Sequence, residues 1–227
     1  MAEESAVSAE SADERAGPAH AEHFESLAQQ SHAAHLGMWV FLASEALLFA
    51  GLFALYAALR WQHGRGFDVG IAHSEKLIGS INTGILLLSS YAVATAVLAL
   101  RDGKRTTSLL LVLFTIGCGA AFLALKLHEY SRHFDEGIYP GGAGRFFQEH
   151  PEPGIATFFT LYFIATGLHS LHVIVGMGVL AWLAWKLARG TLDAPYDHPL
   201  ALGAMYWHLV DIVWIFLWPL FYLTAGG

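Results

Sequence analysis

Five long apolar segments dominate this sequence and leave little chain for anything else. An α-helix needs about 20 mostly apolar residues to cross a hydrocarbon core of ~30 Å. Hydrophobic residues make up 55% of the 227 residues and charged residues only 14%, which is too apolar for an ordinary soluble domain. The sequence therefore predicts an all-α fold, a polytopic membrane bundle of five transmembrane helices. The predicted spans are roughly residues 35–59, 78–100, 107–128, 155–186 and 200–224.

The first 33 residues differ in character from the rest. They carry most of the formal charge of −7, because seven acidic residues face a single base, Arg15. A stretch rich in Ala, Ser, Glu and His cannot bury enough apolar surface to order itself. We therefore expect a flexible acidic tail at residues 1–33 and one membrane domain at residues 34–227. Four histidines lie within this part of the chain or next to it, His20, His23, His32 and His35. We favour incidental solvated side chains over a metal site.

The tail lacks the basic start and apolar centre of a cleavable signal peptide, so the first span is expected to direct insertion. Lys and Arg divide almost evenly between the two sides of the membrane. The basic loop "RDGKRTT" belongs inside by the positive-inside rule, whereas the acidic segment 129–154 suits the outer side. We expect a cytoplasmic N-terminus and a periplasmic C-terminus. No basic patch points to nucleic acid as a partner.

Glu45 lies near the middle of the first span. A carboxylate at that depth costs ~2.5–3.5 kcal/mol on insertion scales, so it is expected to face protein or trapped water. Desolvation disfavours its charged form. A stripe of small residues lies beside it, Gly37, Ser44, Gly51 and Ala58, and would let another helix approach closely. Two interpretations stay open: a proton-exchanging carboxylate, or a neutral one that forms a structural hydrogen bond.

Other polar residues recur within the later spans. His169 and His172 share a face of the fourth span, His208 and Asp211 have the same spacing in the fifth, and Glu129 follows in "LHEY" at the end of the third. These side chains could converge inside the bundle. Structural hydrogen bonding between helices is the favoured interpretation, and metal or haem ligation and a proton- or lipid-related role remain as alternatives.

The remaining features concern packing. Cys118 is the only cysteine, which excludes intrachain disulfides and thiolate metal clusters. Trp207 and Trp214 lie seven residues apart on one face of the last helix. Pro219 is expected to kink that helix, and the carbonyl it frees should meet a neighbour or water. The Gly- and Pro-rich segment 131–154 is expected to be a surface excursion and not a span.

Three strings in this sequence resemble signatures of subunit III of the haem-copper respiratory oxidases. The resemblance covers about residues 34 to 224, and the three signatures occur in the order of the family. Each alone is weak, but together they are very specific. They are "GMWVFLASEALLFAGLF", "TFFTLYFIATGLHSLHVIVG" and "YWHLVDIVWIFLWPLFYL".

The resemblance implies roles for individual residues. Glu45 matches the mid-membrane carboxylate that reacts with carbodiimide in relatives. The other matches are the paired histidines His169 and His172, the pair His208 and Asp211 of the final helix, and the adjacent Glu129 and Tyr130, which match the Glu-Tyr of the family. The family also implies a non-catalytic subunit, with haem and copper held by partner subunits and no metal or cofactor in this chain. Phospholipid is expected in its clefts, and subunits I and II are expected as partners.

The chain departs from the commoner seven-helix pattern, because the first two helices are absent. Its link after Glu129 also contains an apparent insertion of roughly a dozen residues. The resulting hypothesis is subunit III of a proton-pumping cytochrome c oxidase in a bacterial inner membrane. The complex would take electrons from cytochrome c and reduce oxygen to water, while this subunit would support proton uptake, lipid binding and the stability of subunit I.

Alternative functions remain open at this point. Within the family, the chain would serve a quinol oxidase or accompany a nitric oxide reductase. From other classes, we keep an independent haem- or metal-binding membrane enzyme that uses His169, His172 and His208. A proton-coupled transporter built around Glu45 is the other, although such transporters tend to have inverted repeats and no internal symmetry is visible in the sequence.

Overall fold

The computed structural model describes residues 27–194 and 197–224. Within these residues the chain is helical and contains no strand, and five of its helices are long and apolar enough to cross a membrane. The all-α, five-helix prediction is therefore confirmed. The membrane-spanning helices are α2 (Leu27–Gln62), α4 (Lys76–Arg101), α5 (Arg105–Asp135), α7 (Ile155–Arg189) and α8 (His198–Trp218) with its extension η2 (Pro219–Leu223).

The chain divides into two compact units between Phe41 and Leu42, inside α2. The arrangement described below is that of the residues from Leu42 onward. Residues 27–33 of the predicted tail form the first turns of α2, and the rest of the predicted tail lies outside the described residues.

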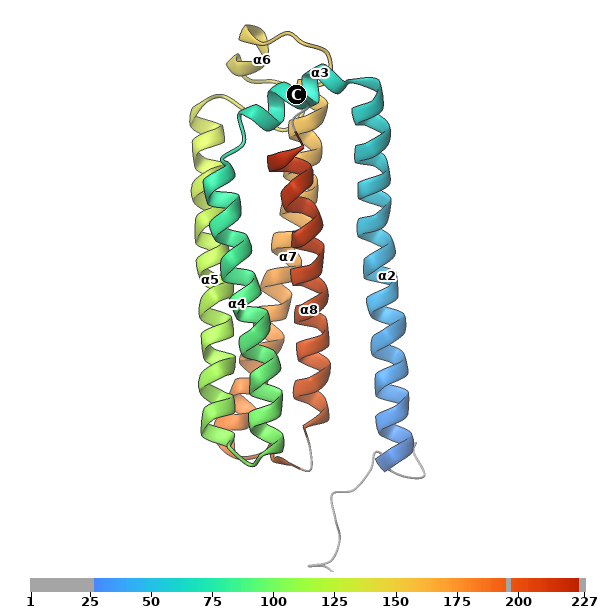
Figure 1. Ribbon diagram of the computed structural model, residues 1–227, viewed down its shortest axis with the longest axis vertical. Helices are drawn as coiled ribbons and strands as arrows, with labels where there is room; N and C mark the ends of the chain where they lie inside the picture. Colours follow the sequence, from blue (N-terminus) through green and yellow to red (C-terminus); the bar gives the residue numbers. More distant parts are fainter. Residues whose placement is uncertain (1–26, 195–196, 225–227) are drawn as a thin grey trace, which may run out of the picture. The chain divides into compact units, whose positions relative to one another are not determined.

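Four helices pack against one another in the order α4, α5, α7, α8, and α8 returns to contact α4 (Figure 1). A tight turn joins α4 to α5, where Gly103 takes a positive φ of 73° and the Lys104 N–H donates to the Ala99 carbonyl at 2.8 Å. Such a turn satisfies the last carbonyls of a helix at its C-terminus. It therefore makes α4 and α5 an antiparallel hairpin.

The interior of these four helices is filled by aromatic residues that pack over glycine. Trp207 and Trp214 are fully buried on one face of α8, as predicted, and their indole N–H groups donate to Ser89 at 2.9 Å and to Thr83 at 3.1 Å. A Cβ on Gly176 would lie 3.0 Å from the Trp207 ring. Because only glycine leaves that space, α7 and α8 approach closely here.

From Leu42 onward, α2 buries a narrow stripe of its surface. Leu42, Phe49 and Tyr56 are buried, and they lie seven residues apart. The small-residue stripe follows a different line, because a Cβ on Gly51 would meet nothing within 4 Å. The small residues predicted to receive a helix are therefore not packed against the described part of this chain at Gly51.

One end of the helices carries two short helices, α3 (Gly64–Ala72) and α6 (Arg145–Glu149). Phe67 of α3 is buried and packs edge-on against Phe158 of α7 at 5.5 Å between ring centroids. The predicted surface segment 131–154 does not form a span. Its first five residues continue α5 as far as Asp135, seven residues beyond the predicted end of the third span at residue 128.

The hydrogen-bonding pattern of the last helix changes at Pro219, and the kink and the partner of the carbonyl that Pro219 frees stay predictions. The α-helix ends at Trp218 and continues as the π-helical turn η2. The Tyr56 hydroxyl donates to the Leu220 carbonyl at 2.5 Å, so a side chain from α2 satisfies that carbonyl. Arg60, one turn further along α2, donates to the Thr224 hydroxyl at 2.6 Å.

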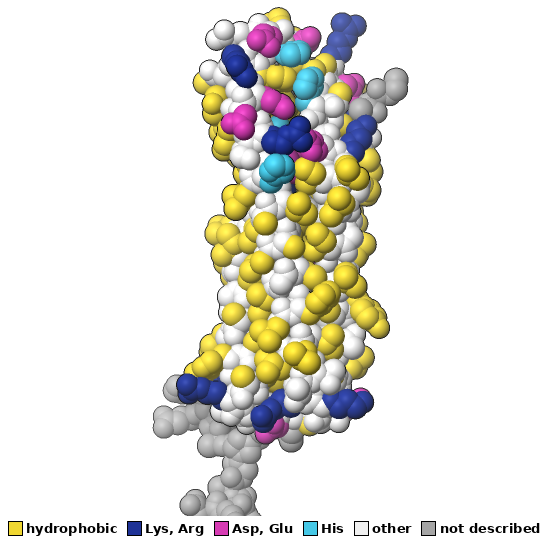
Figure 2. Space-filling view, turned by 90° about the vertical axis from the view of Figure 1, so that its left-hand side faces the viewer, with side chains coloured by type: hydrophobic (Ala, Val, Ile, Leu, Met, Phe, Trp, Pro, Cys, Tyr) yellow, Lys and Arg dark blue, Asp and Glu magenta, His cyan; other side chains and the backbone are white. Residues whose placement is uncertain are grey.

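Charged side chains gather at the ends of the helices. In Figure 2, hydrophobic side chains form a broad band, Lys and Arg lie at both ends, and Asp, Glu and His gather mainly at the end that carries α3 and α6. The opposite end, at the α4–α5 turn, carries exposed Arg101, Lys104 and Arg105. This distribution matches an apolar belt in contact with lipid between two polar interfaces.

Candidate functional site

Glu45 of α2 forms a hydrogen bond with His172 of α7. The distance between Glu45 Oε2 and His172 Nε2 is 2.8 Å, and the two side chains are 19% and 14% exposed. The other ring nitrogen, Nδ1, lies 2.8 Å from the Leu168 carbonyl oxygen. A carbonyl can only accept, so Nδ1 carries a hydrogen.

This geometry limits the protonation states of the pair. With Nδ1 protonated, the bond between Nε2 and Oε2 contains a single proton, which belongs either to the imidazole or to the carboxyl group. Glu45 and His172 are therefore either an ion pair or a neutral hydrogen-bonded pair, and neither state leaves a net charge at this depth. Phe49 packs edge-on against the His172 ring at 5.3 Å between centroids, which keeps the ring in place.

A second polar cluster lies buried between α5, α7 and η2. Lys126 Nζ donates to Glu129 Oε2 at 3.0 Å and to the hydroxyls of Tyr162 and Tyr222, both at 2.9 Å. Each of these hydroxyls donates in turn to Glu129 Oε1 at 2.7 Å. The Lys126 and Glu129 side chains are only 2% and 1% exposed.

Aromatic rings complete the surroundings of the buried ammonium group. Lys126 Nζ lies 4.7 Å from the centroid of the Tyr162 ring and 5.5 Å from that of Trp214, within the range of cation–π attraction. The cluster is closed and carries no net charge when both residues are ionised. It is suited to holding α5, α7 and η2 together.

Sequence reasoning selected Glu129 but missed Lys126, Tyr162 and Tyr222. Lys126 lies inside a span, and an intramembrane charge normally marks a partner or a site. Its position three residues before Glu129 was the available signal. Glu129 and Tyr130 are adjacent in sequence but have different partners, because the Tyr130 hydroxyl bonds Thr166 Oγ1 at 2.6 Å.

His169 has a different environment from His172, although both lie on α7 three residues apart. Its side chain is fully buried, and neither ring nitrogen has a hydrogen-bond partner among the described residues. The ring packs against Phe122 at 5.5 Å and against Trp214 at 5.2 Å between centroids. It therefore fills core space between α5 and α8.

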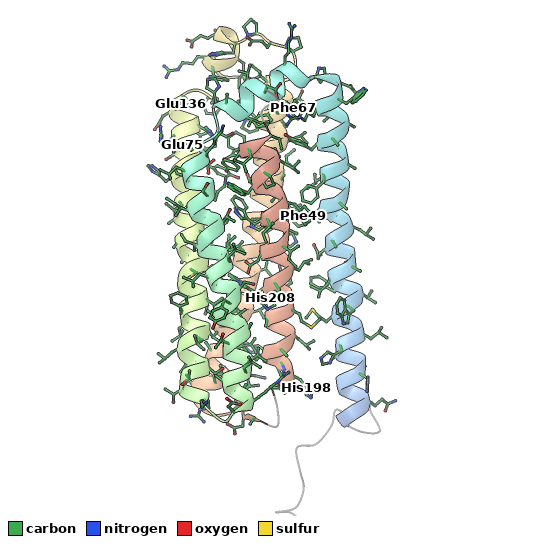
Figure 3. All side chains as sticks on the ribbon, in the orientation of Figure 1. Phe49, Phe67, Glu75, Glu136, His198 and His208 are labelled. Atoms are coloured by element: carbon green, nitrogen blue, oxygen red, sulfur yellow. The ribbon has the colours of Figure 1, made fainter. Side chains whose placement is uncertain are left out.

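His208 and Asp211 lie on α8 but also differ in environment. His208 Nδ1 lies 2.6 Å from Ser90 Oγ of α4, and the ring is half-buried. Asp211 is 3% exposed, and neither of its carboxyl oxygens forms a well-aligned hydrogen bond in the described part of the chain, although the Ser90 side chain lies close enough to interact with them. Figure 3 places His208 between α4 and α8 and Phe49 on α2.

The structure thus places the predicted residues in separate environments. Glu45 pairs with His172, and Glu129 joins the Lys126 cluster. His208 and the buried Asp211 both lie next to Ser90, and His169 is buried with neither ring nitrogen hydrogen-bonded among the described residues. Across residues 27–194 and 197–224, no group of three or more His, Cys, Asp or Glu side chains is placed to hold a metal ion. The contacts of Glu45 with His172, of Lys126 with Tyr162 and of Ser90 with His208 each join one helix to another.

The fold and these sites thus define a multi-pass helical membrane protein in which polar side chains pair between helices inside the spans. The chain belongs to the cytochrome c oxidase subunit III family, whose model matches residues 19–146 and 154–225. It is thereby a subunit III of the haem-copper oxidases. Residues 147–153, outside both matched segments, lie in the link where the sequence predicts an insertion.

Curated relatives agree with this family. A cytochrome c oxidase subunit 3 from Thermostichus vulcanus is 31% identical over 84% of this chain and 87% of the relative. A quinol oxidase subunit 3 from Bacillus spizizenii is 27% identical over 92% and 98%. A probable quinol oxidase subunit 3 from Staphylococcus epidermidis is 29% identical over 84% and 88%. The relatives are thus named for two different electron donors.

Proposed function

We propose that this chain is the non-catalytic subunit III of a proton-pumping terminal oxidase of a bacterial inner membrane. It packs on the catalytic subunit I beside subunit II, binds phospholipid, and supports rapid proton uptake by its neighbour. The chemistry, with its haem and copper, takes place in the partner subunits. The observation that carries the proposal is the Glu45–His172 pair, a single-proton site inside the membrane of a family member.

A pair that shares one proton suits this supporting role. The proton can move between Oε2 and Nε2 without creating net charge, so the site tolerates a hydrophobic setting. Carbodiimides attack protonated carboxyl groups, and the neutral form of the pair supplies one at Glu45. The contact also joins α2 to α7, so a change at Glu45 would reach the packing of the subunit.

Purification of a tagged chain from its native membrane tests the proposal. In mild detergent it should bring down a large subunit with the visible spectrum of haem, and the complex should consume oxygen. Co-purification of a nitric oxide reductase, or of no haem protein, would overturn the oxidase assignment. A haem Soret band from the isolated chain would instead support an independent haem enzyme.

We propose cytochrome c as the electron donor, on the signatures that led to the family and on the Thermostichus relative, which is named a cytochrome c oxidase subunit. Quinol is the second candidate, favoured by the Staphylococcus and Bacillus relatives. The purified complex discriminates the two, since it should oxidise reduced cytochrome c and not a soluble quinol. Oxidation of the quinol alone would replace the first proposal by the second.

A further inference from the structure

Ser90 of α4 and His208 of α8 form a polar pair at mid-height in the membrane. His208 is the eleventh residue of the span His198–Leu223 and Ser90 is the fifteenth of Lys76–Arg101, each of 26 residues. At 1.5 Å per residue they lie about 4 Å and about 2 Å from the middle of their spans. The bilayer offers no hydrogen bond at that depth.

One nitrogen of this pair is left without a partner. Nδ1 of His208 is hydrogen-bonded to the Ser90 hydroxyl, and Nε2 has no hydrogen-bond partner among the described residues. Nε2 is also not one of the buried unpartnered atoms, so it reaches the molecular surface. In an isolated chain this nitrogen would lie against acyl chains, which cannot satisfy it.

The surface around this nitrogen is apolar and open. α4 and α8 lie side by side (Figure 1), and Figure 3 shows His208 between them. We call this surface the α4–α8 face. Its large exposed side chains are Leu87 and Tyr91 of α4 and Ile212 and Ile215 of α8.

We propose that a transmembrane helix of a partner subunit packs on the α4–α8 face and places an uncharged hydroxyl or amide side chain against Nε2 of His208. The inference rests on the proposed function, because it needs an oxidase complex to supply the helix. It goes further by naming the contact face and the chemistry of the contact.

The chemistry of the partner follows from the two neighbours of His208. Ser90 can donate to Nδ1 or accept from it, so Nε2 is an acceptor in one tautomer and a donor in the other. Hydroxyl and amide groups serve both cases. A partner cation would need a counter-charge, and the Asp211 oxygens are buried inside this chain where the partner cannot reach them.

Other outward surfaces suit lipid better. α7 exposes Leu171 and Ile174, and its Ser170 hydroxyl is satisfied by the Thr166 carbonyl of the same helix at 2.8 Å. These side chains therefore need no hydrogen bond from a partner. His208 therefore distinguishes the α4–α8 face from the outward face of α7.

Site-specific photo-crosslinking in the native membrane tests this inference. A benzoylphenylalanine at Tyr91, which is 71% exposed on the α4–α8 face, is compared with one at Leu171, which is 54% exposed on α7. We expect a covalent adduct with an integral membrane subunit from position 91 and none from position 171. Mass spectrometry of the adduct should identify a helix with Ser, Thr, Tyr, Asn or Gln at the depth of His208.

The possible failures are distinguishable. Two results would overturn this inference and leave the proposed function intact, provided that a haem-containing complex co-purifies. The first is an adduct only from position 171. The second is an adduct from position 91 with a helix that lacks any hydroxyl or amide at the depth of His208. If no haem subunit co-purifies, the proposed function falls, and this inference falls with it.

A set of variants provides a second measurement. His208→Phe keeps a ring and removes the hydrogen bond, and His208→Gln restores a group that can donate and accept. We expect dissociation of the subunit from the complex to be about tenfold faster in His208→Phe, the ratio that corresponds to the loss of one hydrogen bond, and close to wild type in His208→Gln. His128→Phe, at an exposed site on α5, is the matched control. An unchanged rate in His208→Phe would contradict the inference.

Discussion

At the scale of single residues, Glu45 and His172 show how a carboxyl group is accommodated inside a membrane. The bond to Leu168 uses the hydrogen on Nδ1, so the bond to Glu45 uses the only proton that remains. Removing the carboxyl group from this pair should therefore abolish the reaction of Glu45 with carbodiimide.

Glu45→Gln should abolish carbodiimide labelling of this subunit, because the amide cannot react and still bonds His172. Labelling with a fluorescent carbodiimide, followed by electrophoresis of the complex, measures the effect. Glu75→Gln, at a carboxylate paired with Arg132 near the α3 end, is the control and should label like wild type. Undiminished labelling of Glu45→Gln would show that another carboxyl group is the reactive one.

The Lys126–Glu129 pair allows a sharper test of stability. Lys126→Met leaves a buried carboxylate without its counter-charge and should lower the free energy of unfolding by ~3–5 kcal/mol. The double variant Lys126→Met/Glu129→Gln should recover most of that loss, because it removes both charges and keeps an acceptor for the two tyrosine hydroxyls. Unfolding in mixed detergent micelles measures both values.

Tyr222→Phe provides a smaller companion change. It removes one hydroxyl from the cluster and should cost about 1–3 kcal/mol, without leaving a net charge. If the single variant Lys126→Met were as stable as the double variant, the ion pair would not be what holds the cluster together.

The sequence predicted these residues unevenly, for physical reasons. Glu45 could be singled out because a carboxylate at the centre of an apolar run is expected to face protein or trapped water and not lipid. Its partner His172 could not be chosen over His169, because both lie on α7 and only the position of α2 decides which one meets Glu45. Lys126 could not be recognised as buried, because a predicted span that ends at residue 128 places residues 126–129 near the interface, whereas the helix continues to Asp135.

At the scale of the helices, glycine has two different uses. On α7, a Cβ at Gly176 would meet the buried Trp207 ring at 3.0 Å, whereas a Cβ at Gly178 would meet nothing within 4 Å. The two glycines are two residues apart on one helix. Sequence alone cannot separate them, because a small residue in a span suits a tight contact and an open surface equally.

Gly176→Ala should therefore destabilise the protein by ~1–3 kcal/mol through overpacking against Trp207. Gly178→Ala should be neutral or stabilise by up to about 1 kcal/mol, because alanine favours the helix. Thermal unfolding of the two variants in one detergent provides the comparison. Equal unfolding temperatures would show that Trp207 moves to make room.

The helix α2 shows how far a sequence pattern can predict an interface. Both the small-residue stripe and the stripe Leu42, Phe49 and Tyr56 repeat every seven residues. The large residues, and not the small ones, are buried within the described chain. The two patterns are equally periodic, so the choice between them depends on the other helices.

At the scale of the whole molecule, the basic end of the helices predicts the orientation in the membrane. Arg101, Lys104 and Arg105 lie at the α4–α5 turn, with Lys186 and Arg189 near the end of α7, and the positive-inside rule places such an end in the cytoplasm.

Cysteine labelling in intact cells tests that orientation. In a Cys118→Ala background, Gln148→Cys in α6 should react with a membrane-impermeant maleimide. Lys104→Cys should react only after the cells are opened. Both side chains are exposed in the structure, so access to the reagent is the only variable. The reverse pattern would invert the proposed topology.

The arrangement of the Lys126 cluster also bears on the order of biosynthesis. Lys126 and Glu129 are three residues apart on one helix, so the two opposite charges would pass through the translocon together, each shielding the other. The hydroxyls that complete their hydrogen bonds belong to α7 and η2, which are synthesised later. We therefore expect closure of this core to await the synthesis of Tyr222.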